Sequence, residues 1–133
     1  MYIDIDNIQG MHYYGDMIYM IDTEGQIIKL NPLQSEIVST ILEQSEKEQV
    51  ILKLEKKLRI DKLTANCMID QILKIYDEYF KYVSTKSLDD IPVSGEKGKR
   101  YPHDITLALT KRCMQRCKHC INYASEFEKT DLP

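Results

Sequence analysis

Three of the chain's four cysteines, Cys113, Cys117 and Cys120, lie close together near the end of the sequence. A closed structural metal site uses four protein ligands, whereas a site with three keeps a coordination position open for a molecule that reacts. Basic side chains lie between and beside the thiols, and positive charge favours the metal-binding thiolate form. They are Lys111, Arg112, Arg116 and Lys118. The spacing therefore predicts an open metal site with three thiolate ligands.

An alternating apolar stretch precedes these cysteines, from His103 to Leu109, and predicts a strand that runs directly into the cysteine loop. This order resembles the start of radical S-adenosylmethionine (SAM) enzymes. The resemblance implies that Cys113, Cys117 and Cys120 bind three irons of a [4Fe-4S] cluster, while the fourth iron takes the amino and carboxylate groups of SAM. It also implies a cofactor contact for His119, in the position where an aromatic side chain often meets the adenine.

Two other interpretations of the cysteines stay open. Zinc would fill a closed site with His119 or His103 as its fourth ligand, and zinc is also a candidate occupant for these 133 residues alone. If the segment were helical, the three cysteines would share one face and could be small packed residues. A disulfide framework is not expected, because three of the four cysteines crowd into one short loop.

The bulk composition excludes several classes of partner. The net charge of -3 and the pI of about 5.6 give no basic field for nucleic acid or anionic lipid. No apolar run approaches the length of a membrane span, and the acidic opening residues do not form a signal peptide. Together with clustered free thiols, these features predict a cytoplasmic protein with neither a nucleic-acid nor a membrane partner.

The first part of the chain predicts an α+β domain. Short strands are expected near residues 2–5 and 11–14, followed by a hairpin of residues 17–21 and 26–30 around a turn that Asp22 opens and Gly25 closes. Three helices follow. We expect Asn31 with Pro32 to start the first, a Ser45–Glu48 capping box to start the second, and Asp61 to cap a third that runs to about Tyr82. The apolar positions predicted to face inward on the third helix are Leu63, Cys67, Ile69, Ile72, Leu73, Tyr76, Phe80 and Val83.

The element order of residues 10–83 resembles the winged-helix, PqqD-like recognition domain of enzymes that modify ribosomally synthesised peptides. In that family, the leader segment of a precursor peptide adds as a strand to the third strand, against the third helix. An edge strand offers unpaired N–H and C=O groups to such a peptide. Carried over to this chain, the peptide-binding strand is Gln26, Ile27, Ile28, Lys29 and Leu30, and the helix residues expected to face the peptide are Met68, Gln71, Ile75 and Tyr79.

Composition divides the chain into three parts. Residues 1–83 form the expected winged-helix recognition domain, residues 84–102 are a polar linker rich in glycine and proline, and residues 103–133 begin an incomplete (β/α) radical SAM barrel. A full barrel of eight units needs about 250 residues. We therefore expect the sequence to be the N-terminal part of a longer enzyme, and we do not expect these residues alone to turn over substrate.

The resulting functional hypothesis is leader-peptide recognition within a radical SAM peptide maturase of the SPASM type. By resemblance, a 5'-deoxyadenosyl radical made from SAM would abstract hydrogen from the peptide and lead to a thioether, a crosslink or an epimerised centre. Two alternatives remain: a winged-helix DNA-binding regulator with a metal-sensing cysteine tail, and a zinc-stapled interaction protein. Balanced charge on the predicted third helix weakens the DNA hypothesis. A homodimer through an edge strand or through swapping is a further possibility.

Overall fold

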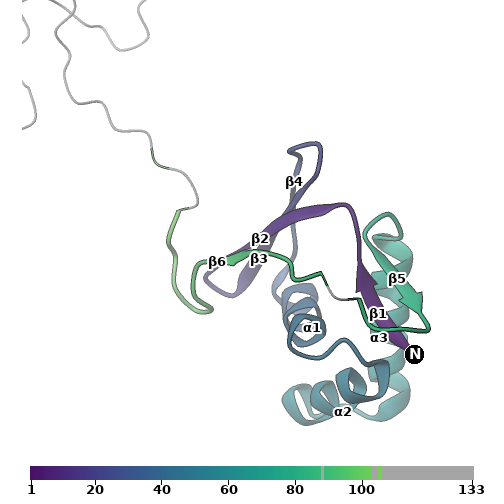
Figure 1. Ribbon diagram of the computed structural model, residues 1–133. Coiled ribbons are helices and arrows are strands. Elements are labelled where there is room, and N and C mark those ends of the chain that lie inside the picture. Colours follow the sequence, from purple (N-terminus) through teal and green to yellow (C-terminus); the bar gives the residue numbers. More distant parts are fainter. Residues whose placement is uncertain (88, 103–104, 106–133) are drawn as a thin grey trace, which may run out of the picture. The chain divides into compact units, whose positions relative to one another are not determined.

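The computed structural model describes residues 1–87, 89–102 and 105 (Figure 1). It divides the chain into two units, Met1–His103 and Asp104–Pro133, and the elements below all belong to the first. Cys113, Cys117, Cys120, His119 and the predicted barrel strand lie outside the described residues. The elements are β1 (Tyr2–Ile5), β2 (Ile8–Tyr14), β3 (Met17–Asp22), β4 (Ile27–Lys29), α1 (Pro32–Glu43), α2 (Lys47–Leu58), α3 (Lys62–Ile75), β5 (Phe80–Val83) and β6 (Val93–Ser94).

The strands of the described residues form a four-stranded sheet and a separate pair. In the larger sheet the order is β4-β3-β2-β6, where β3 pairs antiparallel with both β4 and β2, and β6 pairs parallel with β2. The smaller sheet pairs β1 with β5 in antiparallel register. With three helices and mixed sheets, this part of the chain confirms the predicted α+β class and is compatible with a winged-helix-like layout.

The hairpin turn between β3 and β4 forms as its residue types predict. Asp22 Oδ1 accepts hydrogen bonds from the backbone N–H groups of Glu24 (3.0 Å) and Gln26 (2.8 Å). Gly25 has φ +84°, in the left-handed region that favours glycine. The same aspartate is 5% exposed, so its carboxylate is a buried anchor of the turn.

Two of the three predicted helix starts are confirmed. Asn31 and Gln34 form a capping box before α1, with Pro32 in the first turn, and Asp61 accepts from Thr64 N (3.2 Å) before α3. The predicted Ser45–Glu48 box is wrong, because α2 has Glu46 at its N-cap and no side-chain cap bond. The chain there is extended, and the Ser45 carbonyl accepts from Ile3 N at 2.7 Å instead.

The third helix is shorter than its apolar periodicity predicted. It ends at Ile75 rather than near Tyr82, and Phe80–Val83 forms β5, which pairs with β1 along its whole length. This pairing satisfies backbone groups that a longer helix would satisfy internally, so tertiary contact overrides the local pattern. Leu63 (75% exposed) and Cys67 are on the surface, contrary to prediction, while the buried face of α3 consists of Ala65, Ile69, Ile72 and Leu73.

A single apolar core lies between the helices and one face of the larger sheet. Along β3 the buried residues Ile18 and Met20 alternate with half-buried neighbours, which is the two-residue period of a strand with one face covered. Helix α1 packs against this strand, and α3 packs against α1 and α2. The largest fully buried side chains include Phe80, Met11, Ile18, Met20, Leu30, Ile37, Ile41, Leu54 and Ile69.

Residues 91–101, here named the strap, lie along β2 within the segment predicted as a linker (Figure 1, green ribbon). Met11 N donates to Pro92 O (2.9 Å), Gly15 N donates to Lys99 O (2.8 Å), and Gly98 N donates to Gly15 O (2.7 Å). The strap therefore continues the hydrogen-bonded sheet beyond β2. Among the described residues, no helix is long and apolar enough to cross a membrane.

Candidate functional site

The strand predicted to bind a peptide lies at an edge of the larger sheet. Within the described residues, β4 has β3 on one side and no strand on the other, whereas the opposite side of the sheet ends in β6 and the strap. A strand in this position presents a row of backbone donors and acceptors to solvent. The prediction that residues 26–30 contain an edge strand is therefore met by β4.

The register of β4 determines which of its backbone groups face outward. Leu30 N donates to Ile18 O (2.9 Å), and Asp22 N donates to Gln26 O (3.0 Å). Opposite residues in an antiparallel ladder alternate between bonded and non-bonded pairs. Ile28, opposite Met20, is in phase with the bonded pairs, so its backbone faces β3. The N–H and C=O groups of Ile27 and Lys29 therefore point to the open edge.

Helix α3 ends beside this strand, because two tyrosines anchor its C-terminal side. Tyr79 OH donates to Asp22 Oδ2 (3.1 Å) at the start of the β3–β4 turn, and Tyr76 OH donates to Gln34 Oε1 (3.3 Å) in the first turn of α1. Since α1 begins directly after β4, these bonds hold the end of α3 near both ends of β4. The surface between the open β4 edge and the C-terminal end of α3, which these two bonds hold near each other, is here named the groove.

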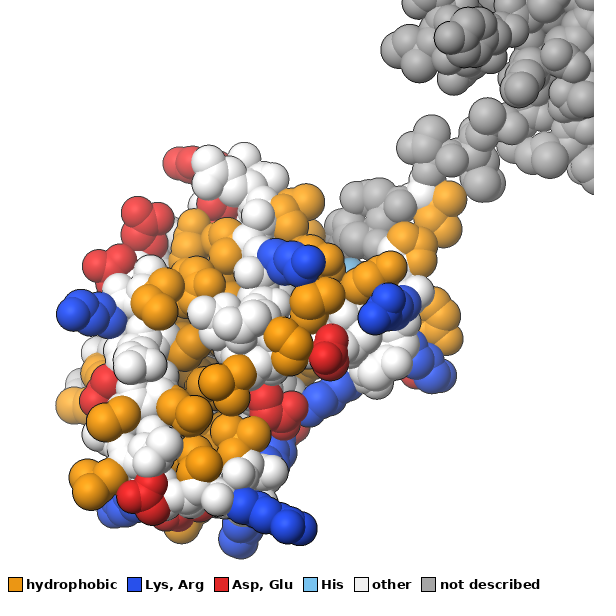
Figure 2. Space-filling model, turned by 180° about the vertical axis from the view of Figure 1, so that it is seen from behind, with side chains coloured by type: hydrophobic (Ala, Val, Ile, Leu, Met, Phe, Trp, Pro, Cys, Tyr) orange, Lys and Arg blue, Asp and Glu red, His pale blue; other side chains and the backbone are white. Residues whose placement is uncertain are grey.

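Apolar side chains gather on this side of the molecule. Figure 2, which views the molecule from behind Figure 1, shows hydrophobic side chains in a band across this face. Ile27 (68% exposed), Ile75 (60%) and Leu33 (45%) are the exposed large hydrophobic residues of β4, of the end of α3 and of the start of α1. Of these, Ile75 is at the α3 side of the groove, Ile27 is on the outer face of β4, and Leu33 lines a separate hollow with Asp16 and Lys97. Exposed apolar side chains of this size are typical of surfaces that bind another chain.

The structure places the residues predicted for the helix side on one stripe of α3 and the turn after it. Met68 and Tyr79 are half-buried, while Gln71 and Ile75 are exposed. On the strand side, Gln26, Ile27 and Lys29 are exposed and Ile28 is half-buried, but Leu30 is fully buried in the core. Leu30 therefore has no side-chain surface to offer a ligand, and its N–H is used by Ile18.

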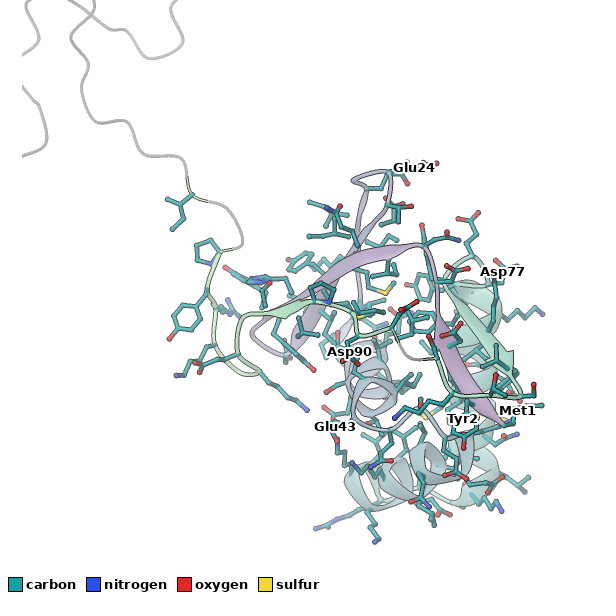
Figure 3. The ribbon with its side chains drawn as sticks, viewed as in Figure 1. Met1, Tyr2, Glu24, Glu43, Asp77 and Asp90 are labelled. Atoms are coloured by element: carbon teal, nitrogen blue, oxygen red, sulfur yellow. The ribbon has the colours of Figure 1, made fainter. Side chains whose placement is uncertain are left out.

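An acidic cleft, which the sequence did not reveal, lies at one end of the groove. It has a volume of about 590 Å³ and lies between the β3–β4 turn and the turn after α3. Figure 3 shows Glu24 and Asp77 on these two turns. Within the described part of the chain, four carboxylates line the cleft with one ammonium, that of Lys81, which is 3.2 Å from the carboxylate of Asp6. The four are Asp22, Glu24, Asp77 and Glu78.

The negative charge of the cleft affects the phenol of Tyr79, which lies beside it. Its partial burial, its hydrogen bond to Asp22 and the nearby carboxylates of Glu78 and Glu24 all raise the pKa of Tyr79. The phenol therefore keeps its proton at neutral pH and remains the donor to Asp22. This bond holds the turn after α3 against the hairpin, which fixes the two sides of the cleft.

The opposite edge of the sheet is closed by side chains as well as backbone. The ring of His12, only 5% exposed, contacts Ser94 Oγ through Nδ1 (2.8 Å) and the Tyr101 carbonyl through Nε2 (2.6 Å). A carbonyl only accepts, so Nε2 carries the proton and donates. In the neutral ring Nδ1 then accepts from the Ser94 hydroxyl. His12 is therefore a structural residue that holds the strap against β2.

Two further contacts fix the strap. Gly95 has φ +78°, and a Cβ there would lie 2.5 Å from the Tyr13 carbonyl oxygen, so only glycine fits without displacement. Lys97 Nζ lies 2.8 Å from Glu36 Oε2 on α1. The Lys97 hydrogen bond is the main cause that lowers the pKa of Glu36.

The predicted cluster ligands Cys113, Cys117 and Cys120, with His119, have no described geometry. Within the described ranges, no three His, Cys, Asp or Glu side chains are grouped so that they could hold a metal ion. Comparisons with protein-family models, with curated proteins and with solved structures found no match to this chain. The edge, the groove and the cleft are therefore interpreted from their own geometry.

Proposed function

We propose that this chain recognises the leader segment of a ribosomally synthesised precursor peptide, as the recognition part of a radical SAM peptide maturase. The observation that carries the proposal is the open β4 edge. The outward backbone groups of Ile27 and Lys29 lie there, and the C-terminal end of α3 is held nearby through the hydrogen bonds of Tyr76 and Tyr79.

Strand addition uses these features directly. A peptide that pairs with β4 gains backbone hydrogen bonds from Ile27 and Lys29 regardless of its sequence, while the groove selects its side chains. The residue opposite Ile28 shares the face of Ile28 and so turns toward α3, where Ile75 is exposed. Exposed apolar residues at a sheet edge invite aggregation unless they have a partner, which favours a binding role.

The cysteine spacing supports the catalytic part of the proposal. Cys113, Cys117 and Cys120 would hold three irons of a [4Fe-4S] cluster, with SAM on the fourth and His119 beside the adenine. When bound, the reduced cluster supplies the electron that cleaves SAM. The role proposed for residues 1–102 is to bind the leader and thereby to raise the local concentration of the tethered core peptide.

Peptide titration tests the recognition role. The probes are overlapping synthetic peptides that cover each short open reading frame next to the gene for this chain, titrated into the 133-residue chain. We expect one segment to bind, and Ile27→Pro to weaken its binding at least about tenfold, since proline removes an outward N–H without removing a bond to β3. Ile27→Ala, which keeps that N–H, is the matched control and should lose less.

Anaerobic iron–sulfur reconstitution tests the cysteine assignment. We expect iron and sulfide in the chain, with a reduced-cluster electron paramagnetic resonance signal that shifts when SAM is added. The triple variant Cys113→Ala, Cys117→Ala and Cys120→Ala should lose both, whereas Cys67→Ala, which removes the exposed cysteine of α3, should keep them. Stoichiometric zinc in a site closed by four protein ligands would contradict the assignment and favour a structural role.

A further inference from the structure

We propose that the peptide paired with β4 has apolar side chains at alternate positions and a lysine or arginine at the end that lies beside the β3–β4 turn. This inference rests on the proposed function, because it specifies which peptide occupies the groove. The groove binds a peptide with a basic end, and the acidic cleft selects this peptide over others.

The apolar alternation follows from the face that each peptide residue would occupy. Side chains of an added strand alternate between the two faces of the sheet, and directly opposite residues share a face. Ile28 lies on the face of the core and α3, where Met68 and Tyr79 are half-buried against the core cluster. A peptide residue opposite Ile28 therefore enters apolar surroundings, whereas its two neighbours share the outer face with Ile27 and Lys29.

The basic end follows from carboxylates that have no partner at the cleft. In the described part of the chain, the side chains of Glu24, Asp77 and Glu78 make no hydrogen bond or ion pair. The acidic side chains of α1 differ, because both are paired with lysines. Glu36 is paired with Lys57 and Lys97, and Glu43 with Lys53 and Lys57.

The cleft has little positive charge of its own to offset these carboxylates. Among the residues that the structure describes, Lys81 is the one ammonium that lines it, and it is engaged by Asp6 (3.2 Å). Asp22 is already bonded to Tyr79 and to the turn N–H groups. A peptide that continues past Ile27 toward the turn brings its next side chains to this cleft. A lysine or arginine there is attracted by several carboxylates, while a glutamate is repelled by them.

Three matched libraries of short synthetic peptides test this inference. All share a central stretch in which Val, Ile, Leu or Phe alternates with Ser or Thr, and their flanks are Lys-Lys, Glu-Glu or Gln-Gln. We expect lysine-flanked peptides to bind the 133-residue chain about tenfold more tightly than glutamine-flanked ones at low ionic strength, and the difference to shrink at high salt. Glutamate-flanked peptides should bind most weakly.

The double variant Glu24→Lys and Asp77→Lys should reverse this preference and bind glutamate-flanked peptides best. Neither side chain supports the fold, so the thermal midpoint should stay near that of the parent chain. Glu55→Lys is the matched control, because Glu55 lies on α2, away from the β3–β4 turn (Figure 1), and its side chain has no hydrogen bond or ion pair in the described structure. That control should keep the preference for lysine.

The outcomes separate the inference from the proposal on which it rests. If peptides bind with the same affinity whatever their flanks, the inference is wrong while leader recognition stands. If no peptide of any flank binds a folded chain, or if the β4 edge pairs with a second copy that peptides do not displace, both are wrong. If the charge-reversed variant keeps the preference for lysine, the preference arises elsewhere and the cleft has no part in it.

Discussion

The two edges of the larger sheet differ, because the strap covers the β2 edge and the β4 edge is open. The β2 edge is occupied by the chain's own strap, through backbone bonds at Met11 and Gly15 and through the ring of His12. The β4 edge has no partner strand among the described residues, and its exposed side chains are the apolar Ile27 and the charged Lys29. Unpaired sheet edges tend to pair with other chains, so an edge is left open at a cost. Since this chain covers its β2 edge and leaves its β4 edge open, we infer that the β4 edge binds a partner.

Gly95→Val should have the largest effect on the closed edge. The new Cβ would lie 2.5 Å from the Tyr13 carbonyl oxygen at φ +78°, so the strap must move away and its contacts are lost. We expect the free energy of unfolding to fall by about 3 kcal/mol, measured by urea denaturation. Gly98→Ala is the control, since φ is also positive there but no atom lies within 4 Å, and it should cost about 1 kcal/mol.

His12→Ala should come next. It removes two hydrogen bonds, leaves the Tyr101 carbonyl without its donor and opens a space under the strap. We expect a loss of about 2 kcal/mol in the free energy of unfolding, together with faster amide exchange at Gly15. Affinity for a peptide at the β4 edge should change less than about twofold, since the two edges are separate binding surfaces. An equal loss at both edges would show that they are coupled.

Ile27→Pro should have a smaller effect on stability at the open edge. Its N–H faces solvent in the free chain, so we expect the free energy of unfolding to change by no more than about 1 kcal/mol. Peptide binding should nevertheless fall sharply. Ile28→Pro removes an N–H that faces β3 and should destabilise the hairpin by about 3 kcal/mol. Equal stability losses for the two variants would contradict the register assigned to β4.

The ion pair between Lys97 and Glu36 should give the smallest effect, and one that depends on pH. Glu36 has its pKa lowered from 4.5 in the folded state, so its stabilising contribution is present above that value and is lost as pH falls through the folded pKa. We expect Lys97→Met to cost about 0.5 kcal/mol near neutral pH. The difference from the parent chain should vanish in acid, and a difference that grows in acid would contradict this sign.

Local chemistry made part of the fold predictable. The Asp22–Gly25 turn and the caps at Asn31 and Asp61 each depend on residues a few positions apart, and all three are present. The same logic failed at Phe80–Val83, where a strand pairs with β1 at the far end of the chain. Helical periodicity alone does not reveal a partner so distant in sequence.

Some parts of the candidate site could likewise be predicted from the sequence, and others could not. A strand at residues 26–30 could be predicted from the hairpin pattern, whereas its role as the peptide-binding edge followed from the resemblance to the recognition domain. The strap is polar and contains Gly95 and Gly98, so its composition resembles a linker, and only its pairing with β2 identifies it as part of the sheet. The acidic cleft combines two turns, at Glu24 and Asp77, that are distant in sequence and become neighbours only in the folded chain, where Tyr79 bonds to Asp22.

Amide hydrogen exchange, resolved by residue and measured with and without the bound peptide, tests the central claim most directly. In the free chain, the amides of Met11 and Gly15 should be protected by the strap, while those of Ile27 and Lys29 exchange quickly. Saturating peptide should slow exchange at Ile27 and Lys29 and leave Met11 and Gly15 unchanged. Protection of Ile27 and Lys29 before any peptide is added, or binding that alters only the β2 edge, would contradict the assignment of β4 as the recognition edge.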